Sequence, residues 1–86
     1  MTFSIEYDKQ PQKFLKKSDK YIAKRIMDKI DEVLPNNPVP KDAVSIVGEH
    51  GIFRIRIGDY RAVYRLNYET NKIIIFKLGK RGKIYD

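Results

Sequence analysis

The sequence predicts an α+β fold in which two N-terminal helices pack on one face of a small antiparallel sheet, in the order β-α-α-β-β-β. Three observations predict it. Residues 2–7 alternate polar with apolar side chains, as a half-buried strand does, and residues 53–78 show strand patterns again. Residues 22–34 instead place apolar side chains at helical spacing. With 86 residues, the chain is predicted to form one domain, residues 1–86, with a thin core.

The N-terminal elements are separated by capping residues. Asp8 follows the first strand and is expected to cap a short helix that ends near Lys17. Pro11 falls in the first turn of this helix, where its missing N–H costs little. Ser18 and Asp19 offer a second cap, after which one apolar stripe indicates a longer helix. That stripe consists of Ile22, Ile26, Ile30, Val33 and Leu34.

Three further strands are expected after the loop "PNNPVP" of residues 35–40. Residues 53–57 and 60–68 alternate, and Gly58-Asp59 between them is a two-residue loop that suits a primed hairpin turn. "ETN", residues 69–71, predicts the next turn. Residues 73–78 are apolar on both faces, which is typical of a central strand.

Pairing across these turns predicts where the arginines lie. A loop at Gly58-Asp59 sets Arg56 opposite Arg61. A three-residue turn at Glu69–Asn71 sets Tyr68 opposite Lys72, Tyr64 opposite Phe76 and Arg61 opposite Gly79. Successive side chains alternate between faces, so one face is expected to hold the following arginines. They are Arg54, Arg56, Arg61 and Arg65, with Arg81 diagonal to Arg61.

Basic charge is concentrated in the C-terminal half of the chain. The formal net charge is +7, and residues 44–86 carry nine basic residues against four acidic ones. Like charges directly across a ladder destabilise a sheet by up to about 1 kcal/mol. A face of this kind is therefore interpreted as a phosphate-binding surface for nucleic acid. The alternative is a solvated hairpin face whose charge only prevents aggregation.

The residue inventory excludes several chemistries. The chain has no cysteine and one histidine, His50 in "GEHG", so thiolate metal sites and paired-histidine catalysis are excluded. No metal site or cofactor is expected, and "GKRG" is not a P-loop. The longest apolar run, Ile73–Phe76, is too short to span a membrane, and no secretory signal is visible. These features predict a cytoplasmic location without membrane contact.

The side chains that remain for catalysis are cations and tyrosines. Cleavage of RNA by the RNA's own 2′-hydroxyl needs few other groups. Arginines can stabilise the extra negative charge of the pentacoordinate phosphorus by bidentate hydrogen bonds. A lysine crowded by other cations can act as a base, and Lys80 and Lys83 are nearest to Arg81. Tyr85 could stack on a nucleobase. The general base stays unassigned.

Two segments, "FRIRIGDYRAVYRL" at residues 53–66 and "IIIFKLGKRGKIYD" at residues 73–86, resemble the RelE/ParE toxin superfamily. The order of the N-terminal strand and helices fits as well, so the resemblance spans the chain and implies a RelE-like fold. The RelE branch contains ribosome-dependent endoribonucleases that cut mRNA in the decoding site. The arginines and lysines of the two segments favour this branch. The resemblance therefore implies an mRNA interferase that needs no metal.

The resemblance also implies roles for particular residues. Arg61 and Arg81 would stabilise the transition state, Arg54 and Arg56 would grip the phosphate, and Tyr85 would stack or assist proton transfer. Family members often carry lysine, the proposed proton acceptor, where this chain has Arg54 and Arg56. Groups supplied by the ribosome could then be needed. The expected catalytic set is Arg54, Arg61, Arg81 and Tyr85, and the expected RNA-binding set is Arg56, Arg65, Lys80 and Lys83.

The same resemblance implies partners: the ribosomal A site with its mRNA, and an acidic RelB-like antitoxin that covers the basic face in a hetero-oligomer. Two alternatives stay open. One is a ParE-like inhibitor of DNA gyrase without nuclease activity. The other is a non-catalytic nucleic-acid-binding domain.

Overall fold

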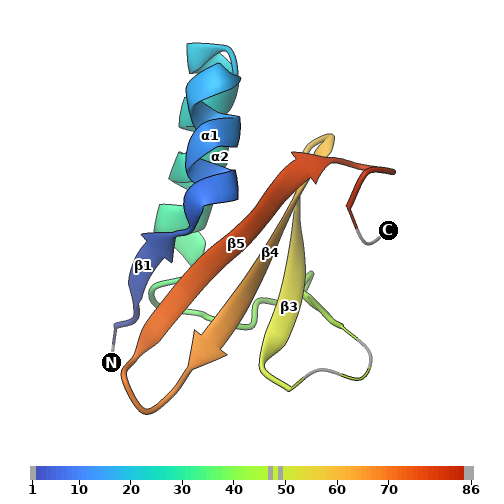
Figure 1. Ribbon diagram of the computed structural model, residues 1–86. Helices are drawn as coiled ribbons and strands as arrows, with labels where there is room; N and C mark the ends of the chain where they lie inside the picture. The colour runs from blue at the N-terminus through green and yellow to red at the C-terminus, as the bar shows by residue number, and fades with distance from the viewer. Residues whose placement is uncertain (1, 47, 49, 85–86) are drawn as a thin grey trace.

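The computed structural model describes residues 2–46, 48 and 50–84. One strand, two helices and four further strands follow one another, which confirms the predicted α+β class (Figure 1). The elements are β1 Ser4–Tyr7, α1 Lys9–Lys17, α2 Lys20–Val33, β2 Val44–Ser45, β3 Ile52–Ile57, β4 Tyr60–Asn67 and β5 Lys72–Lys80.

The five strands form one sheet in the order β1-β5-β4-β3-β2. The strands from β2 to β5 pair antiparallel, but β1 runs parallel to β5, from Ser4 beside Lys72 to Tyr7 beside Ile75. The sheet is therefore mixed, and the prediction of a wholly antiparallel sheet was wrong for this strand. Side-chain alternation reveals which face of a strand is buried, whereas it is the same for parallel and antiparallel neighbours.

Strand β2 was not predicted from the sequence, in which no strand was expected between residues 40 and 53. It contains only Val44 and Ser45, both exposed, and it pairs with Arg54 and Phe53 of β3. Two residues cannot display an alternating pattern. A short edge strand of this kind also leaves few unpaired backbone groups for another chain to pair with.

The helices begin and end close to the predicted positions, but only one of the two predicted caps forms through its side chain. Asp19 accepts a hydrogen bond from the Tyr21 amide at 2.8 Å. Asp8 holds the N-cap position of α1 without a side-chain bond, and its own amide donates to the Ile75 carbonyl at 2.9 Å. The backbone of Asp8 thus extends the β1–β5 ladder into the helix start. Among the described residues, no helix is long and apolar enough to span a membrane.

The predicted apolar stripe of α2 forms the centre of the core. Ile26, Ile30 and Leu34 have no exposed surface, whereas Ile22 and Val33 are half-buried at its margins. Figure 1 shows both helices on the same side of the sheet. Burying an isoleucine side chain contributes about 1.5–3 kcal/mol. The sheet residues of this core are Ile55, Ile57, Ala62, Tyr64, Leu66, Ile73, Ile75 and Leu78.

The β3–β4 register is the predicted one, and the β4–β5 register is the predicted one in only half of the ladder. Arg61 pairs with Gly79 as expected, but Asn67, not Tyr68, pairs with Lys72. Tyr64 correspondingly pairs with Ile75 in place of Phe76. The loop between β4 and β5 is therefore one residue longer than predicted.

An irregularity in β5 explains why both halves of the ladder are well paired. The register shifts between Val63 and Tyr64, whose partners are Lys77 and Ile75. Phe76 is therefore the extra residue of a β-bulge, which offsets the longer loop. As a result, the bulge brings Gly79 back into line with Arg61.

Two buried tyrosines give a stability prediction. Burial raises the pKa of both phenols, so both hydroxyls stay protonated at neutral pH. The Tyr64 hydroxyl donates to the Pro38 carbonyl at 2.7 Å. The Tyr7 hydroxyl is buried and, within the described ranges, has no hydrogen-bond partner.

We expect Tyr7→Phe to stabilise the protein by about 1 kcal/mol, because it removes an unsatisfied buried group. The matched variant Tyr64→Phe should cost about 1–2 kcal/mol, because it leaves the Pro38 carbonyl without this donor. Thermal melting followed by circular dichroism should show shifts of opposite sign, about 4–8 °C per kcal/mol. Equal shifts for the two variants would contradict the assignment.

Candidate nucleic-acid interface

The sheet face opposite the helices, here called the open face, carries the predicted arginines. Arg56 on β3 pairs directly with Arg61 on β4, which in turn pairs with Gly79 on β5. In the next row, Arg54 pairs with Val63. Directly paired residues project to the same face. Arg54, Arg56 and Arg61 therefore lie together at the end of the sheet beside the β3–β4 turn, as predicted.

Arg61 is held against that turn. Only 8% of its surface is exposed, and its Nη1 donates to the Tyr60 carbonyl at 3.1 Å and more weakly to the Gly58 carbonyl at 3.4 Å. An arginine keeps its proton under all ordinary conditions. Arg61 is therefore a fixed positive charge at the centre of the row, with its orientation set by backbone carbonyls.

Arg56 and Arg54 extend this charge outward. Arg56 is exposed, with a long contact of 3.4 Å from Nε to the Gly58 carbonyl. Arg54 is half-buried between Val44 of β2 and Val63 of β4. Two side chains of β3 with different burial can thus approach one anion beside Arg61 of β4.

Arg65 lies apart from the other three. It pairs with Ile52 and Ile74 further along the open face, and its guanidinium lies 5.4 Å from the centre of the Phe76 ring. A cation at this distance from an aromatic face is attracted to it. The structure therefore separates Arg65, predicted as RNA-binding, from the cluster at the turn.

The segment after β5 brings Arg81 to the same end of the sheet. The Arg81 amide donates to the Asp59 carbonyl in the β3–β4 turn at 2.9 Å, and the Lys83 amide donates to the Lys80 carbonyl at 3.0 Å. Gly82 has φ +85°, a conformation that favours glycine in such a turn. The side chains of Lys80, Arg81 and Lys83 are all exposed. Backbone contacts thus fix the position of Arg81 beside the arginine cluster.

Ile84 was missed as part of this face. It is 5% exposed and forms a small apolar cluster with Ile52 and Val63. Its side chain lies so close over Gly79 that a Cβ there would be 2.8 Å from Ile84 Cδ1. The apolar residue after "GKRGK" was the available signal. Tyr85, the predicted stacking residue, lies outside the described residues.

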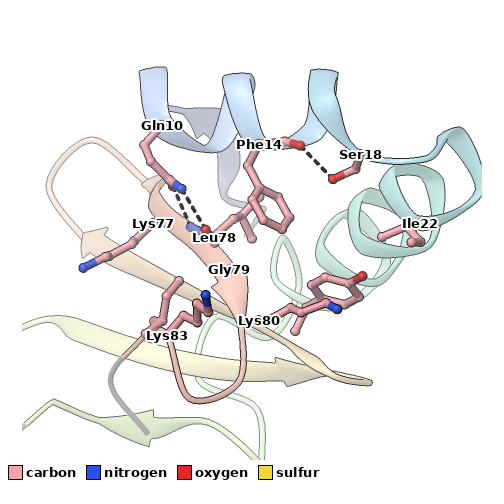
Figure 2. A pocket seen from close by; sticks show the side chains of 11 residues that line it. Gln10, Phe14, Ser18, Ile22, Lys77, Leu78, Gly79, Lys80 and Lys83 are labelled. Atoms are coloured by element: carbon pink, nitrogen blue, oxygen red, sulfur yellow. Dashed lines mark hydrogen bonds between the residues drawn. The ribbon is translucent and has the colours of Figure 1, made fainter.

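Gln10 of α1 was also missed, because its role depends on residues distant in sequence. Its Nε2 donates to the Leu78 carbonyl at 2.8 Å, and its Oε1 accepts from the Leu78 amide at 2.8 Å. Figure 2 shows both bonds between α1 and β5. Strand β1 ends beside Ile75, so the Gln10 amide replaces a neighbouring strand where β5 continues beyond it.

The chain is similar to known toxins in both sequence and fold. A family model described as the ParE toxin of type II toxin–antitoxin system, parDE, matches residues 5–85. The RelE1 protein of Methanocaldococcus jannaschii is 33% identical over 88 residues, which cover 99% of this chain and 97% of that protein. The RelE–RelB complex of Pyrococcus horikoshii OT3 contains a chain that is 33% identical with a TM-score of 0.81, over 96% of this chain and 99% of that one. In the RelB–RelE complex of Methanococcus jannaschii, the identity is 32% and the TM-score 0.71, over 94% and 95%.

The fold and these matches define the class as a toxin of a type II toxin–antitoxin system. The chain belongs to the ParE toxin family, within the RelE/ParE superfamily. It is RelE-like, because its relatives at 33% and 32% identity carry RelE names. The resemblance read from the two sequence segments is thereby confirmed.

The two hydrogen bonds between the Gln10 side chain and the Leu78 backbone, here called the Gln10 clamp, give a testable prediction. Gln10→Ala should destabilise the protein by about 1–2 kcal/mol, because it removes two partly buried hydrogen bonds. The Leu78 amide should also exchange faster with solvent, which amide hydrogen exchange measures at that residue. Gln12→Ala is the matched control, since the Gln12 side chain makes one exposed bond to the Tyr7 carbonyl at 2.7 Å. Unchanged Leu78 exchange in Gln10→Ala would show that the clamp does not protect β5.

Proposed function

We propose that this toxin is a ribosome-dependent endoribonuclease that cleaves mRNA without a metal ion. The observation that carries the proposal is the convergence of Arg54, Arg56 and Arg61 on one face, with Arg81 tied to the adjoining turn. Fixed cations from three neighbouring segments match the charge that develops on a phosphodiester during cleavage. An inhibitor that acts only by binding a protein would not require this cluster.

In the proposed reaction, the 2′-oxygen of one ribose attacks the adjacent phosphorus. The new bond is 2′-O–P and the bond that breaks is P–O5′, which leaves a 2′,3′-cyclic phosphate and a 5′-hydroxyl. Arg61 and Arg81 stabilise the extra negative charge on the phosphoryl oxygens, and Arg54 and Arg56 hold the phosphate in place by bidentate hydrogen bonds.

Two protons must move in this reaction. The 2′-hydroxyl loses one, and the departing O5′ gains one. Arginine cannot accept a proton at neutral pH, so another group must take the proton from the 2′-hydroxyl and return one to O5′. The candidates are Lys80, Lys83, Tyr85 and a group that the ribosome supplies. A base supplied by the ribosome would account for the proposed dependence on the ribosome.

We also propose an antitoxin of the RelB kind as the partner. The similar chains of Pyrococcus horikoshii and Methanococcus jannaschii were solved as complexes of RelE with RelB. A net charge of +7 favours an acidic partner, because oppositely charged surfaces attract and exclude wrong partners.

A gyrase inhibitor is the second candidate, because the matching family model is described by the ParE name. Such a protein would cause DNA damage and leave translated messages intact. Mapping of cut sites on mRNA therefore separates the two functions.

The proposal predicts that Arg61→Ala and Arg81→Ala each slow mRNA cleavage by about 100- to 1,000-fold, the usual effect of losing one transition-state donor. Cut sites are measured by primer extension on a translated message after toxin expression, with and without a translation inhibitor. Lys41→Ala is the charge-matched control, since Lys41 is an exposed cation in the loop between α2 and β2.

Arg81 is exposed, so its variant should fold normally and keeps the test valid if Arg61→Ala is unstable. Cleavage at the wild-type rate by both folded variants would overturn the nuclease proposal. An intact message together with induction of the DNA damage response would favour the gyrase inhibitor.

A further inference from the structure

A groove lies between α1 and the C-terminal half of β5, where β5 continues beyond the end of β1. Its volume is about 510 Å³. Figure 2 shows Gln10 and Phe14 reaching from α1 toward β5, with the lysines of β5 and the following turn nearby. We call it the α1–β5 groove, and it is also lined by Tyr60, Leu78, Gly79, Lys80 and Lys83.

The floor of the α1–β5 groove is aromatic. The rings of Phe14 and Tyr60 meet edge to face, with centres 6.0 Å apart and planes at 71°. Both side chains are half-buried, so each ring keeps an accessible part. Aromatic rings in a basic groove are the surfaces on which single-stranded RNA stacks its bases.

Lysines border the groove on both sides. On α1, Lys9, Lys13 and Lys17 recur at every fourth residue, are exposed, and line a hollow that shares Gln10 and Phe14 with the groove. Residues four apart lie on one face of a helix. On the other side are the exposed Lys80 and Lys83.

The α1 border contains no carboxylate of its own helix. Helix α1 has the sequence KQPQKFLKK, with four lysines and no acidic residue. Between described residues, the ion pairs join Lys24 to Asp28 and Lys72 to Glu6, and none of these four residues lines the groove. Helical lysines of a merely solvated face are commonly paired with acids three or four residues away. The α1 stripe lacks such partners within its own helix.

The Gln10 clamp favours RNA over a polypeptide as the occupant. A peptide that added a strand to β5 would need the Leu78 amide and carbonyl, and both are already bonded to Gln10. Phosphates and bases need no backbone edge. The clamp also holds α1 against β5, so the two lysine borders keep a fixed separation.

Gly79 connects this groove to the open face. It pairs with Arg61 in the arginine cluster and also lines the groove. The groove and the arginine cluster therefore adjoin at this residue of β5.

We propose that the α1–β5 groove is a second RNA-binding site, in which Phe14 and Tyr60 stack a base and the lysines of α1 and the β5 end bind flanking phosphates. The proposal rests on the proposed function in that RNA is taken as the substrate. Its test measures binding and not cleavage, so the two can fail separately.

The test compares Lys9→Gln/Lys13→Gln/Lys17→Gln with Lys24→Gln/Lys41→Gln/Lys72→Gln, which removes the same charge elsewhere. Binding of poly(U) is measured at several salt concentrations. Each lost phosphate contact lowers the slope of log K against log salt by about 0.7, so the groove variant should lose about 2 in slope. The control should stay close to the wild type.

A second pair of variants tests the stacking. Phe14→Leu keeps an apolar side chain and should weaken poly(U) binding by about tenfold, within the range for one lost base stack. Phe53→Leu is the control, because Phe53 is another half-buried aromatic of the helix-covered face, stacked on Tyr64. The lysine variants decide the matter if Phe14→Leu does not fold.

Three results would overturn the proposal. Equal losses in the two lysine variants would show an effect of net charge alone. A wild-type slope in the groove variant would show that RNA does not contact α1. Loss of poly(L-glutamate) binding with poly(U) binding unchanged would assign the surface to an acidic polypeptide.

Discussion

The pairing of Arg61 with Gly79 is the contact on which the open face depends. Gly79 offers no side chain, so Ile84 can pack where a Cβ would stand. Ile84 in turn closes an apolar cluster with Ile52 and Val63. This packing fixes the turn that carries Arg81. The position of Arg81 therefore depends on the absence of a side chain at Gly79, the residue opposite Arg61.

The sequence predicted the β3–β4 half of this face well, for a physical reason. Gly58-Asp59 allows only a two-residue loop, and such a loop leaves one alignment of the flanking strands. The β4–β5 loop has no comparable restriction, so its length and the bulge at Phe76 could not be read from the residues. The positions of Arg54, Arg56 and Arg61 on the open face were therefore predicted correctly, whereas Arg65 lies apart from them and the predicted β4–β5 register was partly wrong.

The features that were missed depend on contacts between distant parts of the chain. Gln10 and Leu78 are 68 residues apart, and a glutamine in a lysine-rich helix resembles any surface residue until the neighbouring strand is known. The parallel direction of β1 was missed for the same reason. Local pattern identifies buried faces, whereas the neighbour of each strand is decided by tertiary packing.

The bulge in β5 allows the two halves of this strand to be aligned with β4 independently. From Lys72 to Ile75, β5 is aligned by the loop that precedes it, and from Lys77 onward it is aligned with the arginine row. Phe76 takes up the difference of one residue between these alignments. The length of the β4–β5 loop and the position of the arginine row are thus independent of each other. One residue could therefore be lost from that loop together with the bulge, without changing the pairing of Arg61 with Gly79.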